Sequence, residues 1–240
     1  MRVISFGCSH TWGSALPDIV HNPIDENGNK KASRFTFGRV IADHYGYEHI
    51  NQGEPGADNY FIAGKIIDFE YKKDDIVIVL WSHLNRYTIN EFVDGKQKQM
   101  RLGPWCIDGR DHPRHIQKLT KTWVRYFDND YDQYIRTFTA IHHTQTLLKC
   151  KGIKSYHLLQ QPSVLSENPL RKNFMKDIKL IPVFFKHYRY IPPLAADNSH
   201  AGRNAHKAFG DAIINEIKLK NIKTIKQISK DRKQKLDTDK

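Results

Sequence analysis

The chain has 240 residues and a mass of 28.0 kDa, with 39% hydrophobic and 27% charged residues and a mean hydropathy of −0.63. This length suits one domain with a full core, and this composition argues against membrane spans. The 38 basic and 26 acidic residues give a net charge of +12 and a pI near 9.5, so nucleic acid has to be considered as a partner.

Strand and helix patterns alternate in the first part of the chain. Arg2 to Phe6 predicts a short strand that runs into a turn, and residues 14–35 predict a long irregular surface loop. Residues 34–44 carry apolar side chains at helical spacing and are followed by Gly46, which predicts a helix with a glycine stop. Residues 47–51 predict the second strand.

The next segment contains the clearest strand signal. Asp58 is a predicted N-cap for a helix through Phe69. The unbroken apolar run from Ile76 to Trp81 predicts a central parallel strand that is covered on both faces.

The second half continues this alternation after an interruption. Residues 86–113 are rich in glycine and predict a strand-poor insertion or lid. A long helical pattern over 116–151, broken near 128–130, is followed by a fourth strand at 153–159 and a short final strand at 188–191. Residues 201–217 predict the last helix of the body.

This order of elements predicts an α/β fold, a three-layer α/β/α flavodoxin-like sandwich with a mostly parallel central sheet. Right-handed crossovers bring the carboxyl ends of all parallel strands to one edge, where such sheets bind ligands. The loops after Phe6, Asn51, Trp81 and Ile191 are therefore the expected site.

Three of those loops carry residues suited to nucleophilic catalysis. Gly7-Cys8-Ser9 follows the first strand, Asn51 precedes Gly56 by five residues, and Asp197 precedes His200 by three. A serine hydroxyl needs an imidazole to take its proton, and the imidazole needs a carboxylate to hold its tautomer. A glycine permits close approach of a backbone N–H to a developing oxyanion.

On these residues the chain resembles the SGNH hydrolase, or GDSL esterase/lipase, superfamily, and in particular a divergent phage and bacterial group within it. The resemblance extends across nearly the whole chain and matches three of the four sequence blocks. It implies Ser9 as nucleophile, His200 as base, Asp197 as the residue that orients it, and Ser9 and Gly56 as oxyanion donors. Cysteine replaces the aspartate of the family's Gly-Asp-Ser block at Cys8.

The remaining block departs from the family pattern. The superfamily places an oxyanion asparagine after the third strand, where this chain reads Trp81-Ser82-His83-Leu84-Asn85-Arg86. Asn85 lies about one residue late and is preferred over Ser82 as the third donor. The resemblance also implies substrate contacts for Arg86, Ser82 and Asn59.

The expected activity is hydrolysis of an ester on a small molecule or glycan, with an acetyl ester on a saccharide as one option, and without cofactor or metal. Two alternatives stay open: a catalytically weakened binding module of the same fold, and a basic protein associated with nucleic acid. Cys8 is a further candidate nucleophile, although its side chain should point away from that of Ser9. For the histidine pairs at 112 and 115 and at 142 and 143, a surface or packing role is preferred over metal ligation. For Trp12, Trp81, Trp105 and the tyrosines of 126–134, core packing is preferred over a sugar-binding groove.

The chain is expected to divide into one domain and a terminal tail. Residues 1–217 form the predicted hydrolase-like domain, with irregular insertions at 14–35 and 86–115, and residues 218–240 form a basic tail with nine basic and three acidic residues. Within the tail Ile222, Ile225 and Ile228 recur every three residues and hint at a short helix on the body. The three cysteines have no metal-ligand spacing, and the sequence carries no signal peptide; both features predict a cytoplasmic protein. If the protein is phage-encoded, the expected location is the host cytoplasm or the virion. The oligomeric state stays open.

Overall fold

A computed structural model describes residues 1–21, 23–24, 28–93, 96–108, 112–126, 129–161 and 176–238. Its centre is a four-stranded parallel sheet in the order β2-β1-β3-β6. These strands are β1 (Arg2–Gly7), β2 (Glu48–Asn51), β3 (Ile76–Trp81) and β6 (Lys154–Leu159). All four strands were predicted, and the apolar run of β3 is buried at every position, as expected for a central strand.

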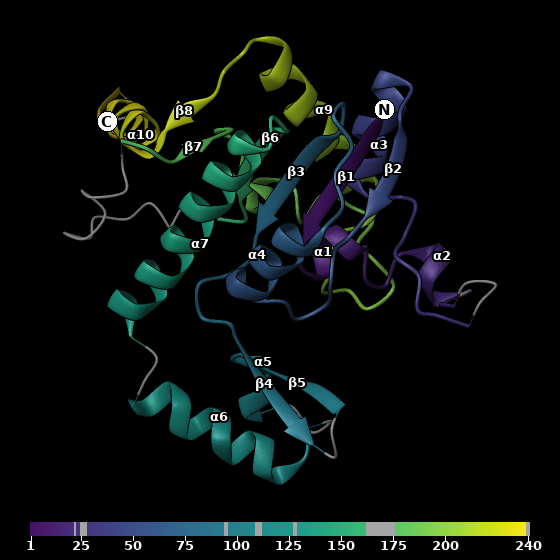
Figure 1. The fold of residues 1–240 in the computed structure, drawn as a ribbon, viewed down its shortest axis with the longest axis vertical. Helices are drawn as coiled ribbons and strands as arrows, with labels where there is room; N and C mark the ends of the chain where they lie inside the picture. The colour runs from purple at the N-terminus through teal and green to yellow at the C-terminus, as the bar shows by residue number, and fades with distance from the viewer. Residues whose placement is uncertain are drawn as a thin grey trace.

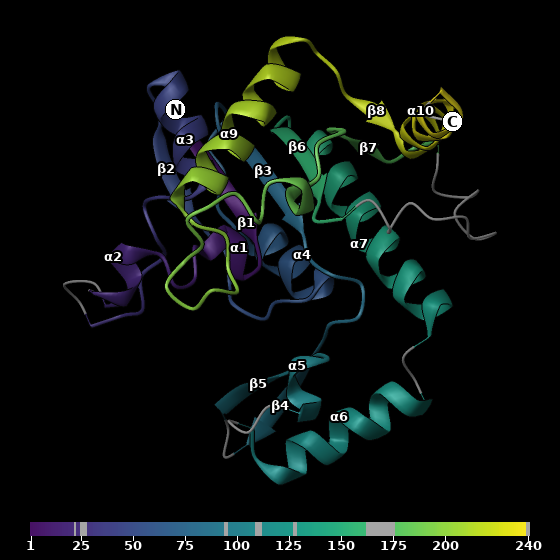
Figure 2. The same ribbon diagram turned by 180° about the vertical axis from the view of Figure 1, so that it is seen from behind.

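Helices cover both faces of the sheet and make the predicted three layers (Figures 1 and 2). One face packs against α4 (Asn59–Asp68) and α7 (Asp130–Cys150), and the other packs against α3 (Phe37–Tyr45) and α9 (Arg203–Lys218). The strands supply side chains to the two layers alternately, because successive residues of a strand point to opposite faces. The α/β/α architecture predicted from the sequence is therefore confirmed.

The predicted irregular insertion after β3 is the main correction to the fold. Residues that were expected to be strand-poor form an antiparallel hairpin of β4 (Tyr87–Val93) and β5 (Lys96–Leu102), followed by α5 (Trp105–Asp108) and α6 (Arg114–Tyr126). The alternation of polar and apolar residues that marks a strand is interrupted here, because residues 96–99 are four polar residues in a row. Figure 1 shows these four elements as a lobe beyond the carboxyl ends of β1 and β3. We call residues 87–126 the lobe.

The expected final strand at 188–191 is also wrong. The chain forms a 3-10 turn at Phe185–His187, and the N–H groups of Tyr188 and Arg189 donate back to the carbonyl of Phe185. A proline follows Ile191 at position 192 and has no N–H to offer a neighbouring strand. The sheet contact in this region is a single parallel bridge between Leu159 and Phe184.

The basic segment after α9 folds onto the body. It begins with β8 (Lys223–Thr224), which pairs with β7 (Lys179–Leu180), and continues into α10 (Ile225–Thr238). Ile225 and Ile228 are buried in the same core as α4 and α7, as expected for a helix on the body, whereas Ile222 precedes the helix and is 42% exposed. The packed body therefore extends past the boundary predicted at residue 217.

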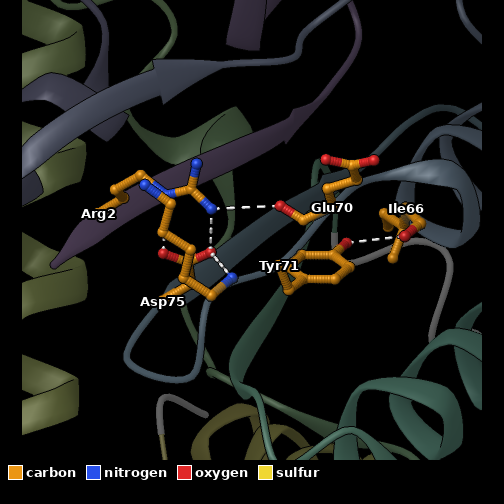
Figure 3. A network of polar contacts seen from close by, with 6 residues as sticks. Arg2, Ile66, Glu70, Tyr71 and Asp75 are labelled. Atoms are coloured by element: carbon orange, nitrogen blue, oxygen red, sulfur yellow. Dashed lines mark hydrogen bonds and ion pairs between the residues drawn. The ribbon is translucent and has the colours of Figure 1, made fainter.

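An ion pair joins the start of β1 to the turn before β3, at the end of the strands away from the lobe (Figure 3). The guanidinium of Arg2 on β1 bonds both carboxylate oxygens of Asp75, at 2.9 and 2.5 Å, and also donates to the carbonyl of Glu70. The Asp75 side chain is 1% exposed and accepts the N–H of Lys72 as well. These bonds align the start of β1 with the turn that leads into β3.

The short helix α2 (Pro17–Val20) lies in the predicted surface loop and begins with a proline, as the first turn of a helix allows.

No helix in the described part of the chain combines the length and the apolar character that a bilayer crossing requires.

Candidate active site

Ser9 is the first residue of the four-residue helix α1 (Ser9–Trp12), directly after β1. The turn between strand and helix is tight: a Cβ on Gly7 would lie 2.8 Å from the carbonyl oxygen of Leu80 and 2.1 Å from Thr11 Oγ1. Only glycine fits between these groups. Ser9 is thus held at the carboxyl end of a central strand, where the sequence predicted the site.

The loop after β2 is tied to α1 through Asn51. Its side-chain amide donates to the carbonyl of Thr11 at 2.7 Å, and its side-chain oxygen accepts the N–H of Gly53 at 2.9 Å. A Cβ on Gly53 would lie 2.4 Å from the backbone nitrogen of Trp12, so this loop touches α1 backbone to backbone. Asn51 therefore fixes the approach of the second loop to the first.

Gly56 follows at the far end of that loop with a φ of +78°, a conformation that favours glycine. It faces the lobe, because a Cβ built there would lie 3.1 Å from Arg101 Cδ and 3.9 Å from the Trp105 ring. Among the described residues, no hydrogen bond joins Gly56 to Ser9.

Asp197 and His200 form the compact unit that their spacing predicts. The Asp197 carboxylate accepts the N–H groups of Ser199 and His200, at 3.0 and 2.9 Å, and lies 2.5 Å from Nδ1 of His200. Burial alone would raise the pKa of Asp197, but these hydrogen bonds outweigh burial and hold its pKa well below the ordinary value. The carboxylate is thus ionised and fixes the His200 ring with Nε2 left for another partner.

The two distant parts of the chain meet at this edge of the sheet. The rings of His10 and His200 have their centroids 5.2 Å apart, and the N–H of Ala196 donates to the carbonyl of Ala15, at the end of the first loop. Among the described residues no hydrogen bond joins Ser9 to His200. The unit of Asp197 and His200 lies beside the residue that follows Ser9.

The segment after β3 departs from expectation. Asn85, the predicted oxyanion donor, lies in an exposed turn. Ser82 and Asn59 are 2% and 4% exposed, and the Asn59 amide accepts the N–H of Ser82 at 2.7 Å and donates to Thr137 at 2.9 Å. Substrate contacts were predicted for Ser82 and Asn59, and this burial argues against both. Asn59 instead holds the end of β3 against α7.

Arg86 lies where the body meets the lobe. Its guanidinium stacks on Trp105, 4.8 Å from the ring centroid, and reaches the carbonyl of Ala57 at 3.5 Å. Arg101 reinforces this junction by donating to the carbonyl of Pro55 and to the carboxylate of Glu54. Cationic and aromatic side chains therefore join the lobe to the loop that carries Gly56.

Several other candidates have structural explanations. Cys8 is fully buried, and its sulfur accepts a hydrogen bond from Gln160 at 2.7 Å. Trp81 is fully buried and donates to His157 at 3.2 Å, so it does not line a sugar groove. In the described part of the chain no group of three or more His, Cys, Asp or Glu residues is arranged to hold a metal ion.

Four residues that were not predicted from the sequence also lie at this edge of the sheet: His10, His83, Gln160 and Arg189. His10 directly follows Gly7-Cys8-Ser9 and His83 lies in the segment compared with the third block, but neither was assigned a role there. Gln160 and Arg189 belong to no motif, so only the topology could have drawn attention to them. Arg189 also supports the Asp197 loop, because it donates to the carbonyl of Ser199 at 2.7 Å.

Comparison with solved structures finds proteins of similar fold. A carbohydrate esterase, whose active site is described as having divergent catalytic and non-catalytic binding functions, matches 90% of this chain and 68% of its own, with a TM-score of 0.50 and 8% identity. The chain shares the fold of this esterase.

Two further solved structures match with TM-scores just below 0.50. A protein of the G-D-S-L lipolytic family from Desulfitobacterium hafniense gives a TM-score of 0.49 at 11% identity, over 88% of this chain and 97% of its own. An acetyl xylan esterase from the rumen bacterium Butyrivibrio proteoclasticus gives 0.47 at 13% identity, over 91% and 63%. No protein-family model matches the chain, and no curated protein matches it by sequence.

Proposed function

We propose that this chain is a serine hydrolase that cleaves a carboxylic ester through an acyl-enzyme. Ser9 Oγ attacks the acyl carbon while His200 takes its proton, and His200 then returns that proton to the departing alcohol. Water deacylates the serine by the same route, again with His200 as base. Asp197 holds the ring orientation and stabilises the imidazolium.

The observation that carries this proposal is the 2.5 Å contact between Asp197 and His200 beside His10, the residue next to Ser9. A carboxylate that is kept ionised by two backbone N–H donors suits the partner of a catalytic imidazole. For the oxyanion we propose the N–H groups of Ser9 and Gly56. The N–H of Ser9 opens helix α1 and therefore has no acceptor within that helix.

The lobe is proposed to bind the rest of the substrate. Trp105 of the lobe stacks on Arg86 and borders the loop of Gly56, and Trp105 is 38% exposed, which leaves part of the indole for a ligand. Because the carbohydrate esterase shares the fold, esters on saccharides, acetyl esters included, are the first substrates to test.

The test replaces Ser9 by alanine and measures hydrolysis of 4-nitrophenyl acetate. Turnover should fall to the level of the buffer, whereas Ser14→Ala, the same change five residues away, should keep wild-type turnover. Full activity of Ser9→Ala would refute the nucleophile.

A second candidate function is a non-catalytic binding module of this fold. It is favoured by one observation: no hydrogen bond among the described residues joins Ser9 to His200. Stoichiometric labelling of the wild-type protein by a fluorophosphonate, lost in Ser9→Ala, would exclude an inert pocket. Failure to label under conditions where the protein binds a saccharide ester would favour the module.

A further inference from the structure

A cavity of about 220 Å³ lies at the carboxyl edge of the sheet, beside the proposed triad. One part of its lining comes from the strand ends: His10 after β1, His83 after β3, and Gln160 and Gln161 after β6. The other part comes from the segment before α9: Phe185, Lys186, Arg189 and Tyr190. Because His10 also contacts His200, this cavity adjoins the place where an ester would react.

The charged side chains that line the cavity in the described part of the chain have one sign. Lys186 and Arg189 line it, and no carboxylate of a described residue does. Burial, together with the nearby Arg86 and Arg189, lowers the pKa of His83 to about 4. Burial and His200 likewise hold the pKa of His10 well below its ordinary value. Both imidazoles are therefore neutral at pH 7 and supply hydrogen bonds without adding charge.

The wall also contains polar atoms that lack partners. His10 is 4% exposed, and its Nδ1 has no hydrogen-bond partner among the described residues; the same is true of Nε of Arg189. The Nη2 atom of Arg189 is already used by the carbonyl of Ser199, which fixes the guanidinium in place. Buried polar atoms without partners are unfavourable, so a ligand that bonds them would gain affinity.

We propose that this cavity is a subsite for an anionic group of the substrate, a carboxylate or a phosphate. The inference rests on the proposed hydrolase and narrows its substrates to esters that carry such an anion a few bonds from the reacting carbonyl. The guanidinium of Arg189 and the ammonium of Lys186 would bind the anion through charge-assisted hydrogen bonds. A volume of about 220 Å³ has room for such an anionic group.

The size and lining separate this cavity from a larger one elsewhere. A cavity of about 460 Å³ lies between α7, β6 and the segment before β7, and no residue of the proposed triad lines it. It also includes Asp177, so its charge is not of one sign.

The kinetic test compares 4-acetoxybenzoate with its methyl ester, and 4-acetoxyphenyl phosphate with phenyl acetate, so that each anionic ester has a neutral partner. We expect kcat/KM to favour the anionic ester of at least one pair by about tenfold, as for one charge-assisted contact. The pair with the larger preference identifies carboxylate or phosphate. In Lys186→Gln that preference should fall toward one, whereas Lys226→Gln, an equal charge change on α10, should keep it.

A binding test makes the subsite independent of the chemistry. Benzoate and inorganic phosphate are titrated by calorimetry into three proteins: Ser9→Ala alone, Ser9→Ala with Lys186→Gln, and Ser9→Ala with Lys226→Gln. Binding that weakens several-fold with Lys186→Gln but not with Lys226→Gln supports the subsite even if no ester is hydrolysed. Equal binding by all three proteins, or no preference for either anionic ester in an active enzyme, overturns it.

Discussion

His10 and His200 lie ring to ring although they come from opposite ends of the chain, with centroids 5.2 Å apart. His10 is buried after the central strand β1, and His200 is partly exposed in a loop before α9. Their contact brings the loop of Asp197 next to the turn of Ser9. The proposed chemistry depends on this one juxtaposition.

Replacing Asp197 by asparagine tests how His200 is held. The amide keeps an oxygen for the N–H groups of Ser199 and His200 but loses the charge that stabilises an imidazolium, so kcat should fall by about 10²–10⁴-fold. Ester hydrolysis at saturating substrate measures this loss. Circular dichroism should be unchanged, and a variant with wild-type kcat would contradict the role of Asp197.

The pH profile gives a second check on the same residue. Because its hydrogen bonds hold the pKa of Asp197 below the ordinary carboxyl value of 3.8, this carboxylate stays ionised throughout the range in which an imidazole titrates. The acid limb of kcat/KM above pH 4 should therefore have a single ionisation. A second ionisation in that range that disappears in Asp197→Asn would contradict the lowered pKa.

The contact between Gly53 and Trp12 predicts a strict requirement for glycine. A Cβ at residue 53 would lie 2.4 Å from a backbone nitrogen, so Gly53→Ala must push the second loop away from α1 and displace Gly56 from Ser9. We expect a loss of about 1–3 kcal/mol in unfolding free energy and at least tenfold in kcat. Gly64→Ala is the control, since nothing lies within 4 Å of a Cβ at that helical position.

The junction of Arg101 with the loop of Gly56 should set substrate choice. In Arg101→Met the bonds to Pro55 and Glu54 are lost and the lobe is less firmly held. KM for a saccharide ester should rise by about tenfold, as expected for one charged contact, and by less for 4-nitrophenyl acetate, which is too small to reach the lobe. Arg114→Met, an exposed arginine on α6, serves as the control.

The sequence predicted the four sheet strands and the two helical layers because each element has a strong local signal. The Ile76–Trp81 run and the Gly46 stop are examples, and both are confirmed. The hairpin β4–β5 was missed because four polar residues in a row at 96–99 interrupt its alternation and because Gly95 and Gly103 favour an irregular loop. Asp197 and His200 were predicted to pair because one turn carries both, which is a local property.

The rest of the site could not be predicted because it depends on which loops meet. Nothing near Arg189 in the sequence indicates that its guanidinium reaches Ser199, and Asn85 has the right residue type for an oxyanion donor but lies in an exposed turn. After β3, the residue that lines the cavity is His83. Spacing in a motif gives the distance along the chain, whereas the direction of each side chain depends on packing.

The Arg2 and Asp75 pair predicts a defined dependence of stability on pH. Burial would raise the pKa of Asp75, but the bonds from Arg2 and Lys72 lower it below its ordinary value of 3.8. A carboxyl with a lowered pKa in the folded state contributes stability that is complete above 3.8 and is lost as the pH falls through the folded-state pKa. Asp75→Asn should therefore destabilise the protein by about 2–3 kcal/mol at pH 7.

This difference between wild type and Asp75→Asn is measured by urea denaturation at pH 7 and at decreasing pH below 4, where it should shrink. Asp43→Asn removes the exposed pair with Arg39 and is the matched control, with an expected change of about 0.5 kcal/mol or less. A cost for Asp75→Asn that stays constant down to the lowest pH at which the protein is folded would show that lost packing, and not lost charge, causes the destabilisation.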